Sequence, residues 1–230
     1  MIVNRPLMRQ STPSPLPRES DASRPIVIIV DDDAAIREAL SELVFSASLE
    51  PVAFASTKAF LDATLPDRPG CLILDVRMPG ASGLDLQHHL SQSGTSKPVV
   101  FLTGHGDIPM TVQAMKAGAV DFLTKPVRDQ TLLDAVTAGI ALDRARRAEA
   151  VLARRSMERY ETLTPREREV LQKVMRGSLN KQIAFDLGIS EVTVKLHRGN
   201  GMRKMEASSL GQLVRAWQSL PEAMRGPETS

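Results

Sequence analysis

The order of apolar and polar positions divides the chain into a longer first part and a shorter second part. In the first part, short apolar runs predict five strands, at residues 26–30, 52–55, 71–74, 99–102 and 122–123. Apolar residues at helical spacing lie between and after these runs and predict five helices, the last one ending near residue 140. This alternation indicates an α/β fold with a doubly wound, five-stranded parallel sheet that helices cover on both faces.

The second part contains helix signals only. Residues 143–160 are rich in strong helix formers and contain neither Gly nor Pro, so they predict a helical linker between domains at residues 25–142 and 161–222. Thr164 and Glu167 have the spacing of a capping box, and Pro165 suits the first turn of the helix that follows. Gly177 is expected to end this helix.

Two further helices are expected after Gly177, joined by a turn at Gly188. Asn180 is the expected cap of the first, and Ser190 is the expected cap of the second, which begins at Glu191. Two helices joined by a tight turn are typical of a helix-turn-helix, so we expect an all-α second domain. The alternative is a solvated helical bundle that binds no nucleic acid, because this succession of signals also occurs by chance.

Polar and basic side chains on the second of these helices favour the nucleic-acid interpretation, in which the helix enters a major groove. Val192, Val194 and Met205 are expected on its buried side. Gly199 and Gly201 each cost about 1 kcal/mol relative to Ala inside a helix, so we hypothesise a helix that becomes fully ordered on DNA. The candidate DNA contacts are Lys181, Thr193, Lys195, His197, Arg198 and Lys204.

Composition narrows the class of protein. With 42% hydrophobic and 24% charged residues in 230, the chain has an ordinary globular composition. A single cysteine excludes an internal disulfide, and no run approaches the roughly 18 apolar residues of a membrane span, so we expect a cytoplasmic protein without a membrane partner. Residues 1–24, with four prolines among Ser and Arg, and residues 223–230 are expected to be disordered tails.

Charge is distributed unevenly between the two parts. Residues 25–128 carry 8 basic and 12 acidic side chains, whereas residues 161–230 carry 11 basic and 8 acidic ones. Net charges of −4 and +3 suit a cation site in the first domain and a polyanion site in the second. This is weak support, because Lys and Arg are common on any solvated surface.

Charged side chains stand directly after three of the predicted strands. Asp31, Asp32 and Asp33 follow the first strand, Asp75 follows the third, and Lys125 follows the fifth. The carboxyl ends of parallel strands meet at the edge where open α/β sheets bind ligands. Two carboxylates about 4 Å apart repel by about 4 kcal/mol at an effective dielectric constant of about 20, so three in one cleft require a cation. Hard oxygen ligands favour Mg²⁺.

Each of these residues also has a simpler explanation. Asp33 suits the cap of a helix that begins next to it, and Asp75 and Lys125 both precede turn-forming prolines. Their joint position after different strands favours a shared site. In such a site an Asp carboxylate attacks a phosphoryl group and forms an aspartyl phosphate. Mg²⁺, Lys125 and the Thr103 hydroxyl group would stabilise charge on the transferring oxygens.

Four ordered motifs in residues 25–142 resemble those of response-regulator receiver domains, which have a flavodoxin-like fold. The resemblance implies that a histidine kinase phosphorylates Asp75. It implies that Asp31 and Asp32 organise Mg²⁺ together with Asp75 and the backbone carbonyl of Arg77. Thr103 would sense the phosphoryl group, Lys125 would pair with it, and Phe122 would turn inward as a switch. The motifs are Val30-Asp31-Asp32-Asp33, Leu74-Asp75-Val76-Arg77-Met78-Pro79-Gly80, Thr103-Gly104-His105-Gly106 and Lys125-Pro126.

The second domain resembles the LuxR-type DNA-binding domain, and the two domains together resemble a response regulator of the NarL/FixJ type. This resemblance implies a transcription factor rather than an enzyme. It would dimerise when phosphorylated and bind double-stranded promoter DNA, with RNA polymerase as a further candidate partner. The position of Gly199 often faces bases in this family. The motifs are Leu163-Thr164-Pro165-Arg166-Glu167-Arg168-Glu169-Val170-Leu171, Asn180-Lys181-Gln182-Ile183-Ala184 and Thr193-Val194-Lys195-Leu196-His197-Arg198.

Two rival functions remain at this point. A phosphohydrolase with an Asp nucleophile would share the Mg²⁺ site, but it would be expected to carry a second Asp two residues after the nucleophile, where this chain has Arg77. A regulator that binds DNA without phosphorylation is the other. Comparing DNA affinity with and without a phosphoryl donor separates that class from the first interpretation.

Overall fold

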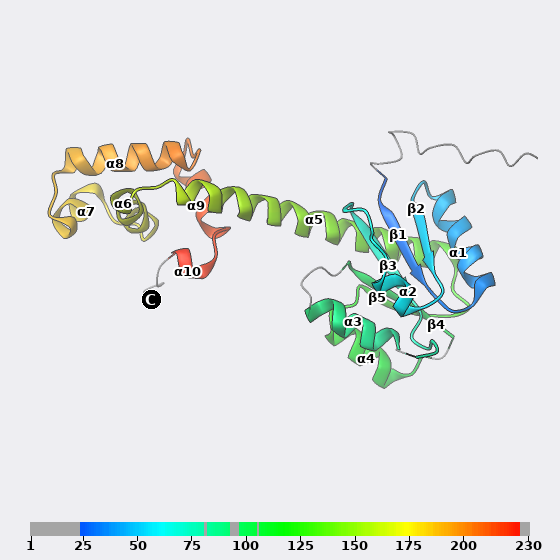
Figure 1. Cartoon of the computed structure of the whole chain (residues 1–230). Helices are drawn as coiled ribbons and strands as arrows, with labels where there is room; N and C mark the ends of the chain where they lie inside the picture. Colours follow the sequence, from blue (N-terminus) through cyan, green and yellow to red (C-terminus); the bar gives the residue numbers. More distant parts are fainter. Residues whose placement is uncertain (1–23, 81, 93–96, 105, 226–230) are drawn as a thin grey trace, which may run out of the picture. The chain divides into compact units, whose positions relative to one another are not determined.

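The structure is a computed structural model that describes residues 24–80, 82–92, 97–104 and 106–225 (Figure 1). The chain forms two compact units, which meet in sequence between Asp143 and Arg144, and each unit is described by itself. Most of the two expected tails therefore lies outside the described residues. Residues 223–225, which we expected to be disordered, belong instead to a short helix, α10 (Glu222–Arg225).

The first unit is built on a five-stranded sheet in the order β2-β1-β3-β4-β5, in which every pairing is parallel. This confirms the predicted α/β fold and the doubly wound sheet. Strands β1, β3 and β4 are buried along their whole length, as the uninterrupted apolar runs predict for a sheet covered on both faces. The strands are β1 (Ile26–Val30), β2 (Glu50–Phe54), β3 (Gly70–Leu74), β4 (Val99–Thr103) and β5 (Asp121–Thr124).

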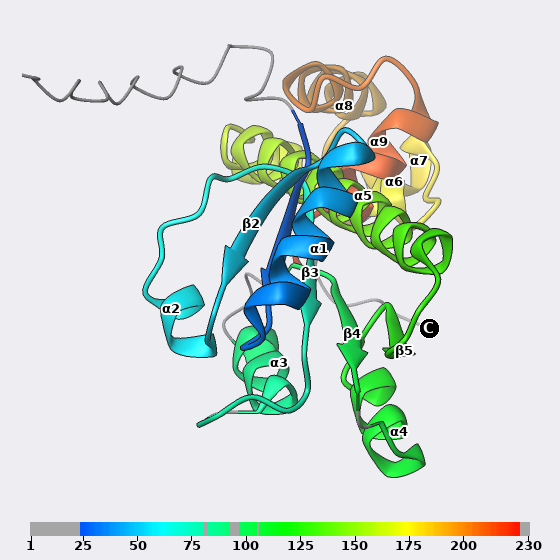
Figure 2. The same ribbon diagram turned by 90° about the vertical axis from the view of Figure 1, so that its right-hand side faces the viewer.

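Helices cover both faces of this sheet (Figure 2). One face packs against α1 and α5, and the other packs against α2, α3 and α4. Alternate residues of β1 serve the two cores, because successive side chains of a strand point to opposite faces: Ile28 lies in one core and Ile29 in the other. The helices are α1 (Ala34–Ser46), α2 (Thr57–Leu61), α3 (Gly83–Gln92), α4 (Ile108–Lys116) and α5 (Asp129–Glu161).

Helix α5 contains residues of both units, and the expected linker at residues 143–160 forms part of this one helix. Asp143, the last residue of the first unit, is buried although it is an acid. Its carboxylate accepts a hydrogen bond of 2.8 Å from the backbone N–H of Gly70 and forms an ion pair of 3.0 Å with Lys97. These contacts tie α5 to the amino end of β3, at the opposite edge of the sheet from the acids that follow the strands.

The second unit is helical, as expected, and its helices pack around one apolar core. The capping box that begins α6 is present: the Glu167 N–H donates to Thr164 Oγ1 over 3.3 Å, and the Thr164 N–H donates to Glu167 Oε2 over 2.8 Å. Trp217 lies in the core with its ring edge-on to Tyr160. The helices after α5 are α6 (Pro165–Met175), α7 (Asn180–Leu187), α8 (Glu191–Lys204), α9 (Leu210–Gln218) and α10.

The turn between α7 and α8 agrees with the sequence in most respects. Gly188 adopts a left-handed conformation with φ of 63°, and the Ser190 side chain caps α8. The expected cap of α7 was wrong by one residue, because Asn180 is already the first helical residue. Its side-chain oxygen accepts a hydrogen bond of 3.1 Å from Arg198 on α8, so it connects the two helices.

Helix α8 is continuous through both of its glycines. The expected gain of order on DNA stays a prediction. Gly201 has a packing reason: a Cβ atom there would lie 2.9 Å from a methyl group of the buried Leu171 on α6. No packing contact requires glycine at position 199, because a Cβ atom there would meet nothing within 4 Å. One glycine therefore lets α8 approach α6 closely, and the other leaves a bare stretch of backbone on the helix surface.

Candidate metal centre and nucleic-acid interface

The carboxyl ends of neighbouring strands bring the predicted acids together. Val30 at the end of β1 pairs with Leu74 at the end of β3, so Asp31 and Asp75 leave the sheet side by side. The Asp75 N–H donates a hydrogen bond of 2.9 Å to the Val30 carbonyl, which fixes this register. β1 lies between β2 and β3, the point at which the winding of the sheet reverses and where such sheets bind ligands.

Three carboxylates form one cluster at this point. Oxygens of Asp31, Asp32 and Asp75 all lie within 4.8 Å of one another. Asp31 and Asp75 are buried, whereas Asp32 is exposed to solvent. Asp33 is not part of the cluster, since its carboxylate caps α1 through the N–H groups of Ala35 and Ile36. The simpler explanation therefore holds for Asp33 alone.

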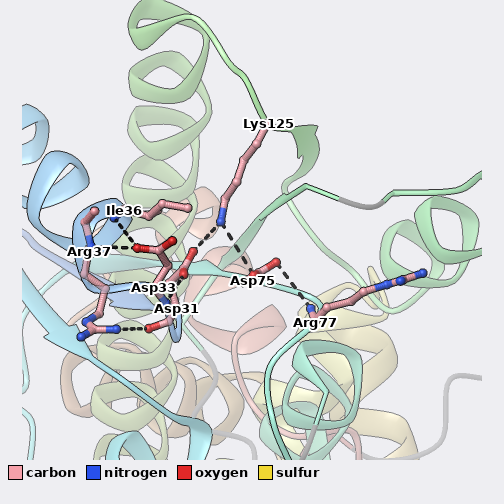
Figure 3. Close-up of polar contacts among 8 residues, drawn as sticks. Asp31, Asp33, Ile36, Arg37, Asp75, Arg77 and Lys125 are labelled. Carbon is pink, nitrogen blue, oxygen red and sulfur yellow. Dashed lines mark hydrogen bonds and ion pairs between the residues drawn. The ribbon is translucent and has the colours of Figure 1, made fainter.

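Lys125 reaches the cluster from the end of β5 (Figure 3). Its amine lies 2.6 Å from Asp31 Oδ2 and 3.7 Å from Asp75 Oδ2. The Lys125 backbone N–H donates to the Thr103 carbonyl over 2.8 Å, so β4 holds the base of this side chain. The Lys125 ammonium group thus lies beside both buried acids. The sequence had predicted that these three groups gather at one edge of the sheet.

The donor set of this cluster fits a divalent cation. Three carboxylates carry three negative charges if ionised, and Lys125 offsets only one of them. All the ligand atoms on offer are hard oxygens, and exposed Asp32 leaves one side open to water. These are the properties that Mg²⁺ prefers in proteins, because it keeps several waters and binds few carboxylates.

Two residues that the sequence did not single out shape the site. Arg37 on α1 donates a hydrogen bond of 2.7 Å from its guanidinium group to the Asp31 carbonyl (Figure 3). Gly83 begins α3 directly against Asp75, since a Cβ atom at Gly83 would lie 2.2 Å from the Asp75 carbonyl oxygen. No sequence pattern reveals either role, because each depends on how a helix packs against the strand end that precedes it by six to eight residues.

The other predicted site residues lie around the acids. Thr103 ends β4 and is fully buried, and half-buried Phe122 on β5 packs with its ring centroid 5.7 Å from that of Phe101. The Arg77 N–H makes a long contact of 3.4 Å with Asp75 Oδ1. The sensing role of Thr103, the switch role of Phe122 and the ligand role of the Arg77 carbonyl stay predictions.

The surface of α8 differs from the expected one. Val194 and Met205 are buried as expected, but Val192 is 76% exposed, so that expectation was wrong. Among the candidate DNA contacts, Lys195 on α8 and Lys181 on α7 are exposed. The other three, Thr193, His197 and Arg198, are half-buried. Two of them also form hydrogen bonds within the unit, Thr193 with Ser190 and Arg198 with Asn180.

Lys204 has a structural role within its own unit. Its amine lies 2.6 Å from Glu167 Oε2 and donates a further bond of 3.1 Å to the Thr162 carbonyl. The Glu167 side chain is almost completely buried, so Lys204 supplies the positive charge that such a carboxylate requires. The expected DNA contact of Lys204 stays a prediction.

This pair makes the stability of the second unit depend on pH. Burial acts to raise the pKa of Glu167, but hydrogen bonds from Lys204 and Thr164 outweigh it and hold the pKa below its usual value. The ionised Glu167 side chain therefore contributes fully to the free energy of unfolding above about pH 4.3, the pKa of Glu in an unfolded chain. This contribution is lost as the pH falls through the lower pKa of the folded state. Glu167→Gln should remove part of this dependence and lower the free energy of unfolding at neutral pH by about 1 kcal/mol.

Urea unfolding followed by fluorescence of Trp217, the single tryptophan of the chain, measures this effect in the unit concerned. Glu169→Gln is the matched control, because Glu169 lies on the same helix in an exposed pair with Arg166. An identical acid dependence in wild type and Glu167→Gln would contradict the assignment.

Comparison with known families gives a match for each unit. Residues 27–137 match the response regulator receiver domain, and residues 161–217 match the bacterial regulatory proteins of the luxR family. Within the described part of the chain, no helix combines the length and the apolar content that a membrane span needs.

Relatives align with both units. Nodulation protein W of Bradyrhizobium diazoefficiens is 50% identical over 199 residues, which cover 86% of this chain and 88% of that protein. Response regulator protein TodT of Pseudomonas putida has the same identity and coverage. The solved structure of the response regulator StyR is 47% identical with a TM-score of 0.73, covering 85% of this chain and 99% of StyR. The solved structure of full-length FixJ from B. japonicum is 37% identical with a TM-score of 0.51, covering 86% of this chain and 97% of FixJ.

Proposed function

Because this chain belongs to the two-component response regulators of the NarL/FixJ type, which join a receiver domain to a LuxR-type DNA-binding domain, we propose that phosphorylation of Asp75 controls its binding to promoter DNA. The coarser assignment, a regulator of transcription, follows from membership of the family. The phosphoryl acceptor, the donor and the response of the DNA-binding unit are the parts proposed here.

In the proposed reaction, a carboxylate oxygen of Asp75 attacks the phosphorus of a phosphohistidine on a partner kinase. The new O–P bond forms as the N–P bond to histidine breaks, and the proton that histidine needs comes from solvent or the kinase. Asp75 suits this role because it is buried and lies next to Lys125, whose amine can move from the acids to the transferred oxygens.

Asp31, Asp32 and Asp75 would hold Mg²⁺, with the Arg77 carbonyl as a further ligand. The ion, when bound, neutralises charge on the phosphoryl oxygens and allows the phosphoryl group to approach the acids. Lys125 holds Asp31 and Asp75 in place, and Arg37 fixes the Asp31 peptide from the other side. These groups therefore orient the nucleophile before any phosphoryl donor arrives.

The phosphorylated state would differ from the free state at the end of β4. The Thr103 hydroxyl group would move towards the new phosphoryl oxygens, and the half-buried Phe122 ring would turn inward behind it. A shift of this kind would favour a homodimer, which presents two α8 helices to paired half-sites. RNA polymerase is a further partner of such an assembly.

One observation supports this function more than any other. Three acids and Lys125 meet at the switch point of a parallel sheet, in a chain whose second unit is a helix-turn-helix. The phosphohydrolase rival gains no support from this geometry, since Arg77 stands where its second acid is expected and contacts Asp75 only through its backbone.

The proposal is tested by the affinity of the full chain for DNA. Duplexes enriched from a random library are titrated with the protein before and after treatment with acetyl phosphate and Mg²⁺. Treatment should tighten binding by about tenfold, within the usual range of coupling between two sites. Equal affinity in both states would instead assign the chain to regulators that bind DNA without phosphorylation.

A further inference from the structure

An apolar strip lies on the open side of α8. The strip consists of Val192 and Leu196, which are 76% and 60% exposed although both are branched aliphatic residues. They lie four residues apart, so they share one face of the helix. The buried residues Val194 and Gly201 point the opposite way, into the core of the second unit.

The surroundings of the strip match nucleic acid better than another protein surface. Exposed Lys195 and Arg203 lie beside it on α8, and exposed Lys181 lies on α7. Figures 1 and 2 show α8 at the edge of its unit, with α6 and α7 on one side of it only. A helix about 10–12 Å wide fits the major groove of B-DNA, which is about 12 Å wide, and basic side chains at its margins meet the phosphates.

We propose that Val192 and Leu196 determine the DNA sequence that this protein selects, by contacting the methyl groups of thymines in the major groove. The proposal rests on the proposed DNA-binding function and adds the base that α8 recognises. Both side chains lack hydrogen-bonding groups, so neither can recognise a base through its donor and acceptor pattern. The thymine methyl group is the one apolar feature that the four bases present in this groove.

The spacing of the strip suits this role. Four residues of helix span about 6 Å, and consecutive base pairs are about 3.4 Å apart, so the two side chains reach different base pairs about two steps apart. Gly199 follows three residues after Leu196 on the same face and has open space above its backbone. The helix therefore carries no side chain there that would hold the strip away from the bases.

The test replaces thymine by deoxyuracil, which differs only in lacking the methyl group. Duplexes are first enriched from a random library with the full chain, in the presence of acetyl phosphate and Mg²⁺. In the best duplex, each thymine is then replaced singly, and dissociation constants are measured for wild type, Val192→Ala and Leu196→Ala. Both substitutions remove exposed side chains, so Trp217 fluorescence should report an unchanged fold.

Wild type should bind about fourfold more weakly for each critical methyl group that is removed. Leu196→Ala should lose this discrimination at one thymine of a half-site, and Val192→Ala should lose it at another. Lys195→Ala should weaken binding equally for thymine and deoxyuracil duplexes, because a phosphate contact does not depend on the base. Phe185→Ala, which removes an exposed aromatic side chain from α7, should leave the discrimination unchanged.

Equal affinity of wild type for thymine and deoxyuracil duplexes would overturn the inference while leaving the proposed function intact. Full discrimination in both alanine variants would overturn it as well. If Leu196→Ala changes the oligomeric state of the protein but not its selectivity, the strip is a protein interface and the inference is wrong. Failure to enrich any duplex would overturn the proposed DNA binding itself and this inference with it.

Discussion

Asp75→Asn is expected to abolish covalent labelling of the chain by acetyl phosphate. The amide has nearly the same shape as the carboxylate but lacks the charged oxygen that attacks phosphorus. Asp31 is also buried beside Lys125, but Asp75 is the acid of the cluster that follows β3, and the proposal assigns the nucleophile to this position. Intact-mass measurement after treatment with acetyl phosphate and Mg²⁺ should show one added phosphoryl group in wild type and none in the variant.

Asp33→Asn provides the matched control for this loss. It removes one negative charge two residues from Asp31, but Asn caps helices as well as Asp does, so α1 should remain intact. Labelling should therefore persist in this variant. Labelling that persists in Asp75→Asn, or disappears in both variants, would contradict the role given to Asp75.

Gly83→Ala is expected to be the most damaging single-methyl substitution near the site. The added Cβ atom would lie 2.2 Å from the Asp75 carbonyl oxygen and 3.0 Å from Leu74 Cγ, and the oxygen belongs to the backbone and cannot rotate away. Helix α3 must then move off the end of β3. We expect a loss of about 3 kcal/mol or more in the free energy of unfolding of the first unit, together with slower phosphorylation.

Hydrogen exchange of amides in β1 and β3 measures this loss in the first unit. Trp217 fluorescence reports only the second unit, whose unfolding transition should stay in place because its core is separate. Gly104→Ala is the control: a Cβ atom there meets nothing within 4 Å, so its effect should stay within about 0.5 kcal/mol. If the amides of β1 and β3 in Gly83→Ala were as protected from hydrogen exchange as in wild type, α3 could adjust without disturbing Asp75, and the expectation would be wrong.

Features that depend on local sequence were the ones that could be predicted. An uninterrupted apolar run such as residues 26–30, in a sequence where such runs alternate with helical patterns, indicates a buried parallel strand. The Thr164–Glu167 capping box and the Ser190 cap were predictable because each bond joins residues three apart. The acid cluster followed from strand ends that share one edge of the sheet, so Asp31, Asp75 and Lys125 could be placed together in advance.

Features that depend on contacts between distant segments could not be predicted. Lys204 has the charge of a DNA contact, and only its position opposite the buried Glu167 shows that it is an internal partner. Val192 is apolar and of a type common in protein cores, but α6 and α7 contact α8 from the other side, so Val192 is exposed. The close approach of Gly83 to Asp75 likewise appears only when α3 is placed against β3.

The two glycines of α8 divide this helix into positions with different freedom to vary. A Cβ atom at Gly201 would lie 2.9 Å from Leu171 Cδ1, so a larger residue there must shift this buried side chain. Gly199 touches nothing, and a side chain introduced there would extend outward without altering the fold. If α8 reads the operator as proposed, position 199 is where an added side chain would change operator preference while leaving the fold intact.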